Sequence, residues 1–126
     1  MFHLAIPTNN LESSKSFYQS LGLRIGRESD QFVIIDFFGH QLVCHLDPEE
    51  VVEKPQMYPR HFGLIVEDES RYEELLSNAR ERKLSFFKDD FRRHQGKKAE
   101  HRSFFLKDES NNLIEFKWYR DPNSIF

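Results

Sequence analysis

The order of elements predicted along this chain occurs twice. The first half alternates like strands at 2–6, 24–28, 31–38 and 41–46, with one helix from Leu11 to Leu21 between the first two. The second half predicts strands at 61–66, 84–87, 102–107 and 113–118, with one helix from about 70 to 82. Placing His3 on His61 also places Phe17-Tyr18 on Leu75-Leu76. This repetition predicts an α+β fold made of two βαβββ units.

Local signals mark where these elements begin and end. Asn9 or Asn10 can cap the first helix through a side-chain oxygen, and Gly22 suits the left-handed residue after it. Ser70 with Glu73 has the spacing of a capping box for the second helix. Asn111 can take a positive φ in a turn at 108–112. We therefore expect the first helix to end at Gly22 and a turn at 108–112 to precede the last strand.

Two stretches lack periodicity and are predicted to be irregular. Residues 47–59 contain Lys-Pro and Tyr-Pro and read as an exposed linker, and residues 88–101 are highly charged and read as a long loop around Gly96. The predicted first unit therefore covers about 1–46 and the second about 60–119, within one domain of 126 residues.

Composition excludes several classes of function. The chain has a net charge of −3, which gives no electrostatic attraction to nucleic acid or membrane, and no apolar run approaches the roughly 18 residues that span a bilayer. Cys44 is the only cysteine, so no internal disulfide can form, and we expect a soluble protein in the cytoplasm. Thirteen phenylalanines supply the volume of a core.

The final predicted strand carries a carboxylate between apolar residues. Glu115 lies between Ile114 and Phe116, and an unpaired buried charge costs several kcal/mol. His3 and His61, each on another predicted strand, could be its partners. Two imidazoles and one carboxylate predict a metal site, whereas the alternative is a buried Glu–His hydrogen bond.

Further side chains could line a cavity. Gln41, Val43 and His45 share one face of a strand, so His45 could act as a general acid or base there, or be an edge histidine without a role. Cys44 faces the other way and is interpreted as a packed thiol. The loop that bears Arg92, with His101 after it, could close over an anionic substrate or form a solvated surface.

Four motifs in order resemble the vicinal oxygen chelate superfamily, which includes glyoxalase I, extradiol dioxygenases, methylmalonyl-CoA epimerase and fosfomycin-resistance proteins. They are His3-Leu4-Ala5-Ile6-Pro7, Ser16-Phe17-Tyr18 through Leu21-Gly22-Leu23, His61-Phe62-Gly63-Leu64-Ile65-Val66, and Asp108-Glu109-Ser110-Asn111-Asn112 leading into Ile114-Glu115-Phe116. The family turn usually reads Asp-Pro-x-Gly-Asn, and here Glu109 and Asn111 replace its Pro and Gly.

The resemblance implies a fold and a ligand set. The two units would form a cupped, partly open barrel that holds a divalent metal through His3, His61 and Glu115, with Fe preferred and Zn, Ni, Co or Mn as alternatives. At the fourth ligand position glyoxalase I has Glu and the epimerase has Gln. Here either Gln41 or Val43 occupies it, and Val43 would leave three ligands, as in the dioxygenases.

The resemblance also implies a function. We expect a metal-dependent, dioxygenase-like enzyme for a small oxygen-bearing substrate, with His45 as a proton acceptor. A glyoxalase- or epimerase-like lyase or isomerase, in which Glu115 carries a proton, is the alternative enzyme. A metal-free protein that sequesters a ligand is the alternative outside enzymes. We expect a homodimer without nucleic-acid or membrane partners.

Overall fold

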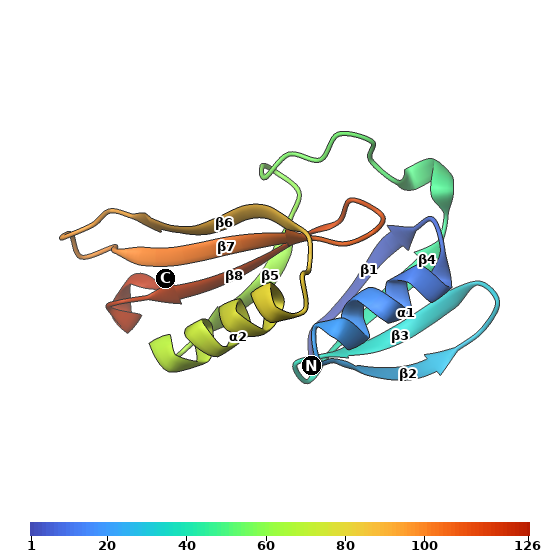
Figure 1. Ribbon diagram of the computed structural model, residues 1–126, viewed down its shortest axis with the longest axis horizontal. Helices are drawn as coiled ribbons and strands as arrows, with labels where there is room; N and C mark the ends of the chain where they lie inside the picture. Colours follow the sequence, from blue (N-terminus) through green and yellow to red (C-terminus); the bar gives the residue numbers. More distant parts are fainter. The chain divides into compact units, whose positions relative to one another are not determined.

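The computed structural model describes the whole chain, residues 1–126. The chain forms two compact units (Figure 1). Unit 1 comprises Met1–Pro55 and Asp108–Asn112, and unit 2 comprises Gln56–Lys107 and Leu113–Phe126. Each unit contains one α-helix and one four-stranded sheet. The α+β fold with two βαβββ units that the sequence predicts is confirmed.

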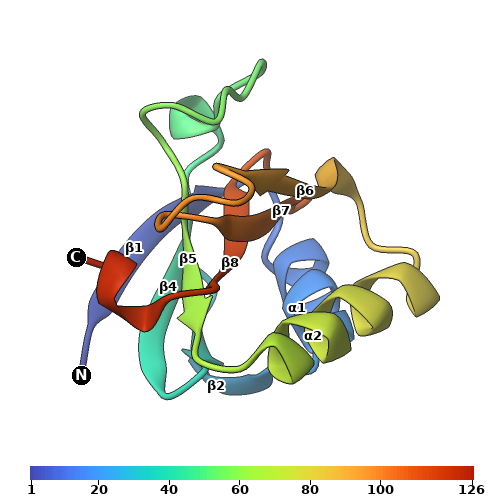
Figure 2. The same cartoon turned by 90° about the vertical axis from the view of Figure 1, so that its left-hand side faces the viewer.

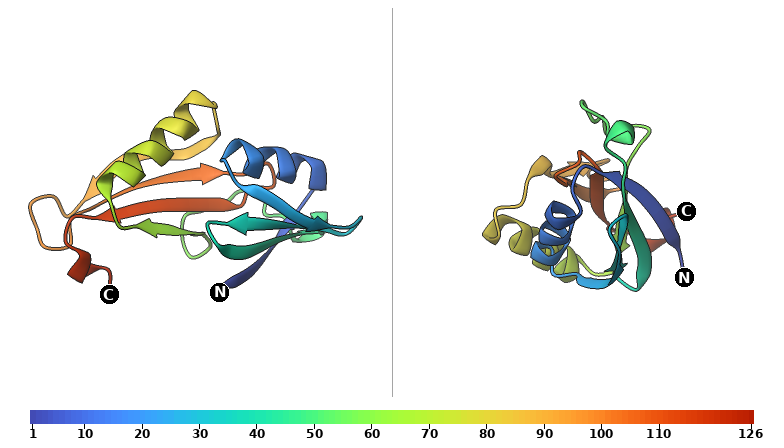
Figure 3. Two further views of the ribbon diagram at one scale, coloured as in Figure 1. Left: turned by 90° about the horizontal axis from the view of Figure 1, so that it is seen from below. Right: turned by 90° about the vertical axis from the view of Figure 1, so that its right-hand side faces the viewer.

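Unit 1 has a mixed sheet in the order β1-β4-β3-β2, in which only the β1–β4 pair is parallel. Helix α1 connects β1 to β2 and covers one face of the sheet (Figure 3). A short 3-10 helix, η1 (Pro48–Glu50), follows the last strand. The bounds are β1 (His3–Thr8), α1 (Leu11–Ser20), β2 (Arg24–Glu28), β3 (Phe32–Phe37) and β4 (His40–Leu46).

The predicted ends of α1 are confirmed. Asn10 is the N-cap, and its side-chain oxygen accepts a hydrogen bond from the backbone N–H of Ser13 at 2.9 Å. Gly22 follows the helix with a φ of 91°, which an L side chain rarely adopts. The fully buried Tyr18 anchors α1 in the core of unit 1.

The turn at Asp108–Asn112 connects two strands of unit 2 but belongs to unit 1. Asp108 is buried and accepts hydrogen bonds from the hydroxyl of Tyr18 (2.8 Å) and from the backbone N–H groups of Ser110 and Asn112 (both 2.9 Å). Burial, and to a smaller extent the neighbouring charge of Glu109, raises the pKa of Asp108 to about 6. The predicted positive φ of Asn111 is confirmed, at 63°.

Unit 2 repeats the topology, with strand order β5-β8-β7-β6 and a parallel β5–β8 pair. Helix α2 covers one face of the sheet (Figures 1 and 2). Its apolar stripe contributes four buried side chains to the core, Tyr72, Leu75, Leu76 and Ala79. The bounds are β5 (Phe62–Val66), α2 (Glu69–Glu81), β6 (Phe86–Arg93), β7 (His101–Lys107), β8 (Leu113–Tyr119) and the 3-10 helix η2 (Pro122–Ser124).

The predicted loop at 88–101 is wrong over its first six residues. Strand β6 runs from Phe86 to Arg93, and only residues 94–100 connect it to β7. Two register shifts, at Phe86/Lys88 and Lys88/Phe91, break the period-two pattern, so the charged stretch shows no alternation in sequence. Its charges are also used in pairs, since Asp90 binds Arg102 at 2.8 Å.

The predicted capping box at Ser70 and Glu73 does not form. The N-cap of α2 is Asp68, two residues before Ser70, and its side chain makes no capping hydrogen bond. Glu73 instead binds Arg102, together with Glu69 at 3.0 Å and Asp90 at 2.8 Å. The guanidinium of Arg102, only 7% exposed as a residue, therefore ties α2 to β6 and β7.

Candidate functional site

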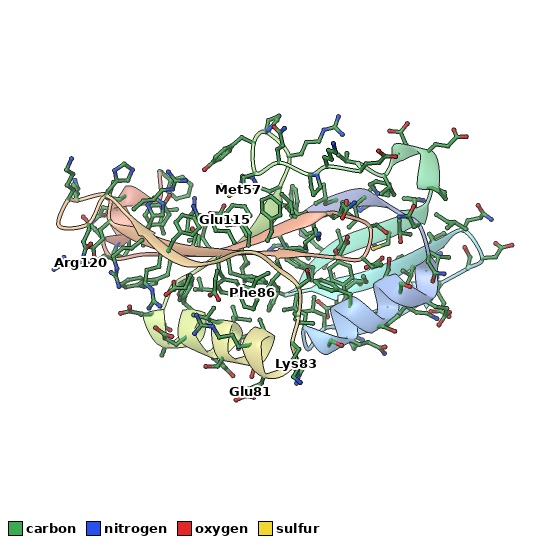
Figure 4. All side chains as sticks on the ribbon, turned by 45° about the horizontal axis from the view of Figure 1, so that its top comes forward. Met57, Glu81, Lys83, Phe86, Glu115 and Arg120 are labelled. Atoms are coloured by element: carbon green, nitrogen blue, oxygen red, sulfur yellow. The ribbon has the colours of Figure 1, made fainter.

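The strongest candidate site lies on the face of the unit 2 sheet opposite α2. His61 immediately precedes β5, and Glu115 lies in the middle of β8, which pairs with β5 in parallel. Nε2 of His61 is 3.2 Å from Oε2 of Glu115. Figure 4 labels Glu115 and Met57 on this side of the sheet, and Glu81 and Lys83 at the end of α2 on the other side. Chain pairing thus brings together two residues that are 54 positions apart in the printed sequence.

The other nitrogen of His61 fixes its tautomer. Nδ1 lies 2.5 Å from the backbone carbonyl oxygen of Met57. A carbonyl oxygen can only accept, so Nδ1 carries a proton and donates it. In a neutral imidazole Nε2 is then an acceptor, and it faces a second acceptor on Glu115. Two acceptors at this distance require a cation between them, either a proton or a metal ion.

Two donors hold the second oxygen of Glu115. The hydroxyl of Ser103 donates to Oε1 at 2.7 Å, and Nζ of Lys117 is 3.4 Å from the same atom. Oε2 has neither of these contacts and is left for His61. The carboxylate, whose side chain is 12% exposed, is therefore oriented by its neighbours before any ligand binds.

Gly63 lets the strand that follows His61 approach Glu115. The two residues are partners in the β5–β8 register. A Cβ atom at Gly63 would lie 1.7 Å from the backbone oxygen of Glu115 and 2.6 Å from its carbonyl carbon. Real Cβ contacts are never this short, so only glycine fits here.

Aromatic rings border the pair. Phe105, which is 1% exposed, meets the His61 ring edge-on with centroids 5.3 Å apart. Tyr58 meets the same ring at 5.8 Å. The His61 side chain nevertheless stays 24% exposed, so the rings border the imidazole without closing it off.

The pair fits a divalent metal as two adjacent ligands. Ligands bound at about 2.1 Å and about 90° apart are roughly 3 Å from each other, close to the 3.2 Å between Nε2 and Oε2. The donation of Nδ1 to a carbonyl is the usual outer hydrogen bond of a ligating histidine. The structure shows no group of three or more His, Cys, Asp or Glu side chains that could hold a metal. His3 belongs to unit 1, and the set His3, His61 and Glu115 stays a prediction.

In unit 1 the register separates the roles of Gln41 and Val43. His3 is exposed, and its Nδ1 lies 2.7 Å from Oε1 of Gln41, its partner on β4. Two residues on, Ala5 pairs with Val43, as Gly63 pairs with Glu115 in unit 2. Val43 thus has the register position of Glu115, while Gln41 orients His3 and leaves its Nε2 free.

His45 lies on the same face of β4 as Gln41 but four residues further along. It pairs with Pro7 and Phe32, is exposed, and contacts the Phe32 ring at 6.2 Å between centroids. The structure therefore places His45 away from the His3–Gln41 pair along the strand. Cys44 faces the opposite side and is fully buried, as expected for a packed thiol.

Arg92 and His101, the two predicted cavity residues of unit 2, lie on opposite faces of its sheet. Arg92 pairs with Arg102, which faces α2, and its guanidinium binds Glu100 at 3.1 Å. This places Arg92 away from Glu115. His101 pairs with Tyr119 on β8, on the same face as Glu115, and contacts its ring at 5.0 Å.

Three contacts of the site were not predicted from sequence. Ser103 and Lys117 could have been found by folding the last two strands into a hairpin about the turn at 108–112, because this places residue 103 opposite 117. The backbone carbonyl of Met57 has no signal in a sequence, since every residue carries one.

The profile of the glyoxalase/bleomycin resistance protein/dioxygenase superfamily matches residues 1–116. The chain belongs to this superfamily. The resemblance seen in the motifs is thereby confirmed. No curated protein matches the chain.

Solved structures of the superfamily give the same fold. A glyoxalase/bleomycin resistance protein/dioxygenase from Alicyclobacillus acidocaldarius is 42% identical, with a TM-score of 0.96 over 100% of this chain and 96% of that chain. The fosfomycin resistance protein FosX from Listeria monocytogenes (15% identity, TM-score 0.76, 99% and 97% covered) shares the fold alone. Lactoylglutathione lyase from Agrobacterium tumefaciens also shares the fold alone, with 16% identity and a TM-score of 0.70 over 94% of this chain and 92% of that chain.

Neither α-helix of the protein has the length and apolar character required to cross a bilayer.

Proposed function

We propose that this protein is a metal-dependent enzyme that binds one divalent ion through His61 and Glu115, with His3 as the third ligand. The observation that carries the proposal is the distance of 3.2 Å between Nε2 of His61 and Oε2 of Glu115 while Nδ1 is committed to Met57. The hydrogen bond from Nδ1 to a carbonyl is the outer contact that a metal-ligating histidine usually makes, and it leaves Nε2 for an ion.

The ligand count favours a dioxygenase-like reaction. Val43 in the register position of Glu115 leaves two imidazoles and one carboxylate, the set used by non-haem Fe(II) oxygenases. When bound, such a metal supplies open coordination positions and Lewis acidity toward a substrate with two neighbouring oxygens. Zn, Ni, Co or Mn in the same set would instead suit a lyase or isomerase.

Neighbouring residues orient Glu115 and border His61. Ser103 and Lys117 keep Oε1 of Glu115 occupied, so that Oε2 points at His61. Phe105 and Tyr58 border the imidazole, whose side chain stays 24% exposed to an incoming ligand. His45, the proton acceptor expected from the sequence, shares the sheet face of His3 but lies four residues along β4 from Gln41, and we assign it no step.

A metal-free role is the second candidate, because the site is also satisfied without an ion. A protonated His61 pairs with Glu115, and no buried side-chain nitrogen or oxygen lacks a hydrogen-bond partner. In that case the protein would sequester a ligand without transforming it.

Element analysis of protein purified without added metal, before and after titration with Fe(II) and Zn(II), separates the two candidates. We expect about one transition metal per chain in the wild type and a large loss in His61→Ala. His94→Ala, which removes an exposed imidazole from the β6–β7 connection, is the control and should keep the metal. Absence of metal uptake by the wild type would contradict the enzyme proposal and favour sequestration.

Oxygen consumption then tests the reaction type. The Fe(II) protein with a simple catechol should consume oxygen if the reaction is dioxygenase-like. Uptake of metal without oxygen consumption would favour a lyase or isomerase.

A further inference from the structure

The face of the unit 2 sheet that carries Glu115 is built from regular rows of side chains. We call it the Glu115 face. Across one row Glu115 pairs with Phe105, and Phe105 pairs with Lys88. Across the next, Lys117 pairs with Ser103, and Ser103 with Phe91. Across the third, Tyr119 pairs with His101, and His101 with Arg93. Residues paired in register share a face, so these nine side chains lie on one face of the sheet, with the three of β7 buried at its centre.

A strip of aromatic rings crosses this surface from the His61–Glu115 pair to β6. The His61 ring meets Phe105 edge-on at 5.3 Å between centroids. Phe105 in turn stacks on Phe91 at 6.3 Å, with an interplanar angle of only 10°. Phe105 is buried and only Phe91 is half-buried, so the apolar surface that a ligand can reach is the Phe91 ring, with Phe105 packed between it and His61.

The outer end of the strip carries two cations. Nζ of Lys88 lies 4.2 Å from the centroid of the Phe91 ring, and the guanidinium carbon of Arg93 lies 5.3 Å from it. Both side chains are exposed, and neither makes an ion pair with an acid. On the α2 side of the sheet, by contrast, Arg92 of β6 and Arg102 of β7 are each paired with carboxylates, and so is Arg80 of α2.

The charge balance of the Glu115 face is therefore positive. Lys88, Arg93 and Lys117 stand against one carboxylate, Glu115, among the nine register-paired side chains. A surface with excess charge of one sign beside apolar rings attracts a ligand of the opposite charge and holds its apolar part by stacking.

We propose that the substrate has a flat apolar body and an anionic group, with the body against Phe91 and the anion between Lys88 and Arg93. This inference rests on the proposed function, because it assumes that the reacting end of the substrate lies at His61 and Glu115. It names Lys88 and Arg93 as specificity-determining residues. A guanidinium and an ammonium on one ring bind a carboxylate or a phosphate equally well in chemical terms.

The test compares 2-naphthoate with 2-naphthamide, a neutral probe of nearly the same shape. Binding is measured by calorimetry in the presence of a metal chelator. We expect the anion to bind at least about fivefold more tightly, and we expect this preference to shrink as salt is raised, because the cations are exposed. Equal binding of the two probes would overturn the inference.

Two double variants test whether the preference for naphthoate arises at Lys88 and Arg93. The double variant Lys88→Met/Arg93→Met should weaken naphthoate binding about tenfold and leave naphthamide binding nearly unchanged. The control Lys97→Met/Lys98→Met removes the same charge from the β6–β7 connection and should keep the preference. Equal loss in both double variants would contradict a site at Phe91 and indicate a general charge effect.

Metal uptake measured on the same preparations separates this inference from the proposed function. A retained preference for naphthoate without metal uptake contradicts the proposed function alone. Normal metal uptake without any preference contradicts the substrate class alone. Inorganic phosphate and benzoate as competitors then distinguish a phosphate-bearing from a carboxylate-bearing substrate.

Discussion

The edge strand pairs of the two units share their topology and differ in their chemistry. In unit 1 the parallel strands β1 and β4 place Ala5 opposite Val43, and in unit 2 the parallel strands β5 and β8 place Gly63 opposite Glu115. Each pair carries a histidine two residues before the small residue, His3 in one and His61 in the other. The carboxylate occurs in unit 2 only.

The hydrogen-bond partners of the two histidines also differ between the units. In unit 1 Nδ1 of His3 meets a side-chain amide, that of Gln41, and His3 is exposed. In unit 2 Nδ1 of His61 donates to a backbone carbonyl, and Glu115 is held by Ser103 and Lys117. The same scaffold therefore carries one histidine in each unit, and the carboxylate of the candidate site lies in unit 2 alone.

Gly63→Ala in unit 2 should lower the stability of the protein more than any other variant considered. The new Cβ would meet the backbone of Glu115 at 1.7 Å, so β5 and β8 would have to separate. We expect a loss of about 3 kcal/mol in the free energy of unfolding, or no folded protein, as measured by chemical denaturation. Gly26→Ala in β2 is the control, because its Cβ would have ordinary contacts, the nearest at 3.4 Å. Equal stability of the two variants would refute the close approach.

Val43→Glu tests whether unit 1 can carry the same chemistry. Val43 is only 6% exposed, so a carboxylate there should lower the free energy of unfolding of the metal-free protein by about 2 kcal/mol. Val52→Glu, at a position that is 39% exposed, should cost little. If adding Zn(II) restores the stability of Val43→Glu, the valine position is a fourth ligand position. If Val43→Glu is as stable as the wild type without metal, unit 1 tolerates a carboxylate at this position as unit 2 does, and the inferred difference between the units is contradicted.

Ser103→Ala sharpens the role of the support around Glu115. The variant removes the hydrogen bond of 2.7 Å to Oε1, and the carboxylate can then rotate. Metal affinity, measured by competition with a chromophoric chelator, should fall about tenfold. Ser77→Ala, an exposed position on α2, should leave the affinity as it is. An unchanged affinity in Ser103→Ala would show that Lys117 alone orients the acid.

Asp108→Asn tests the buried turn of unit 1 through pH. The folded pKa of about 6 lies above the unfolded value, so the folded state binds the proton more tightly and stability from this group falls as pH rises. From pH 5 to pH 7 the wild type should lose about 1 kcal/mol of unfolding free energy relative to the variant. Denaturation curves at both pH values measure this, and parallel pH profiles for the two proteins would contradict the buried acid.

How far the sequence predicts the molecule depends on the element. The two helices and most strands follow from periodic apolar residues and from Asn10 and Gly22, which act locally. Strand β6 was missed because two register shifts and paired charges hide its alternation. Glu73 has the spacing of a helix cap, yet a stronger electrostatic partner, Arg102, binds it. Local patterns therefore fail where tertiary ion pairs compete with them.

The candidate site shows the same division. The need of Glu115 for a partner follows from its apolar neighbours, and the structure supplies His61. The residues that orient the pair depend on strand register and on the path of the backbone before β5. Neither the register nor the backbone path can be predicted from a short motif, so the contacts of Ser103 and of the Met57 carbonyl are seen only in the structure.

The most direct test of the account is anomalous diffraction from crystals of metal-free protein soaked in Co(II). We predict a single peak in unit 2 about 2.1 Å from both Nε2 of His61 and Oε2 of Glu115, lost in Glu115→Gln. A soak that leaves no peak between these atoms, with the imidazole and the carboxylate still in contact, would mean that a proton alone joins them. That result would contradict the metal site.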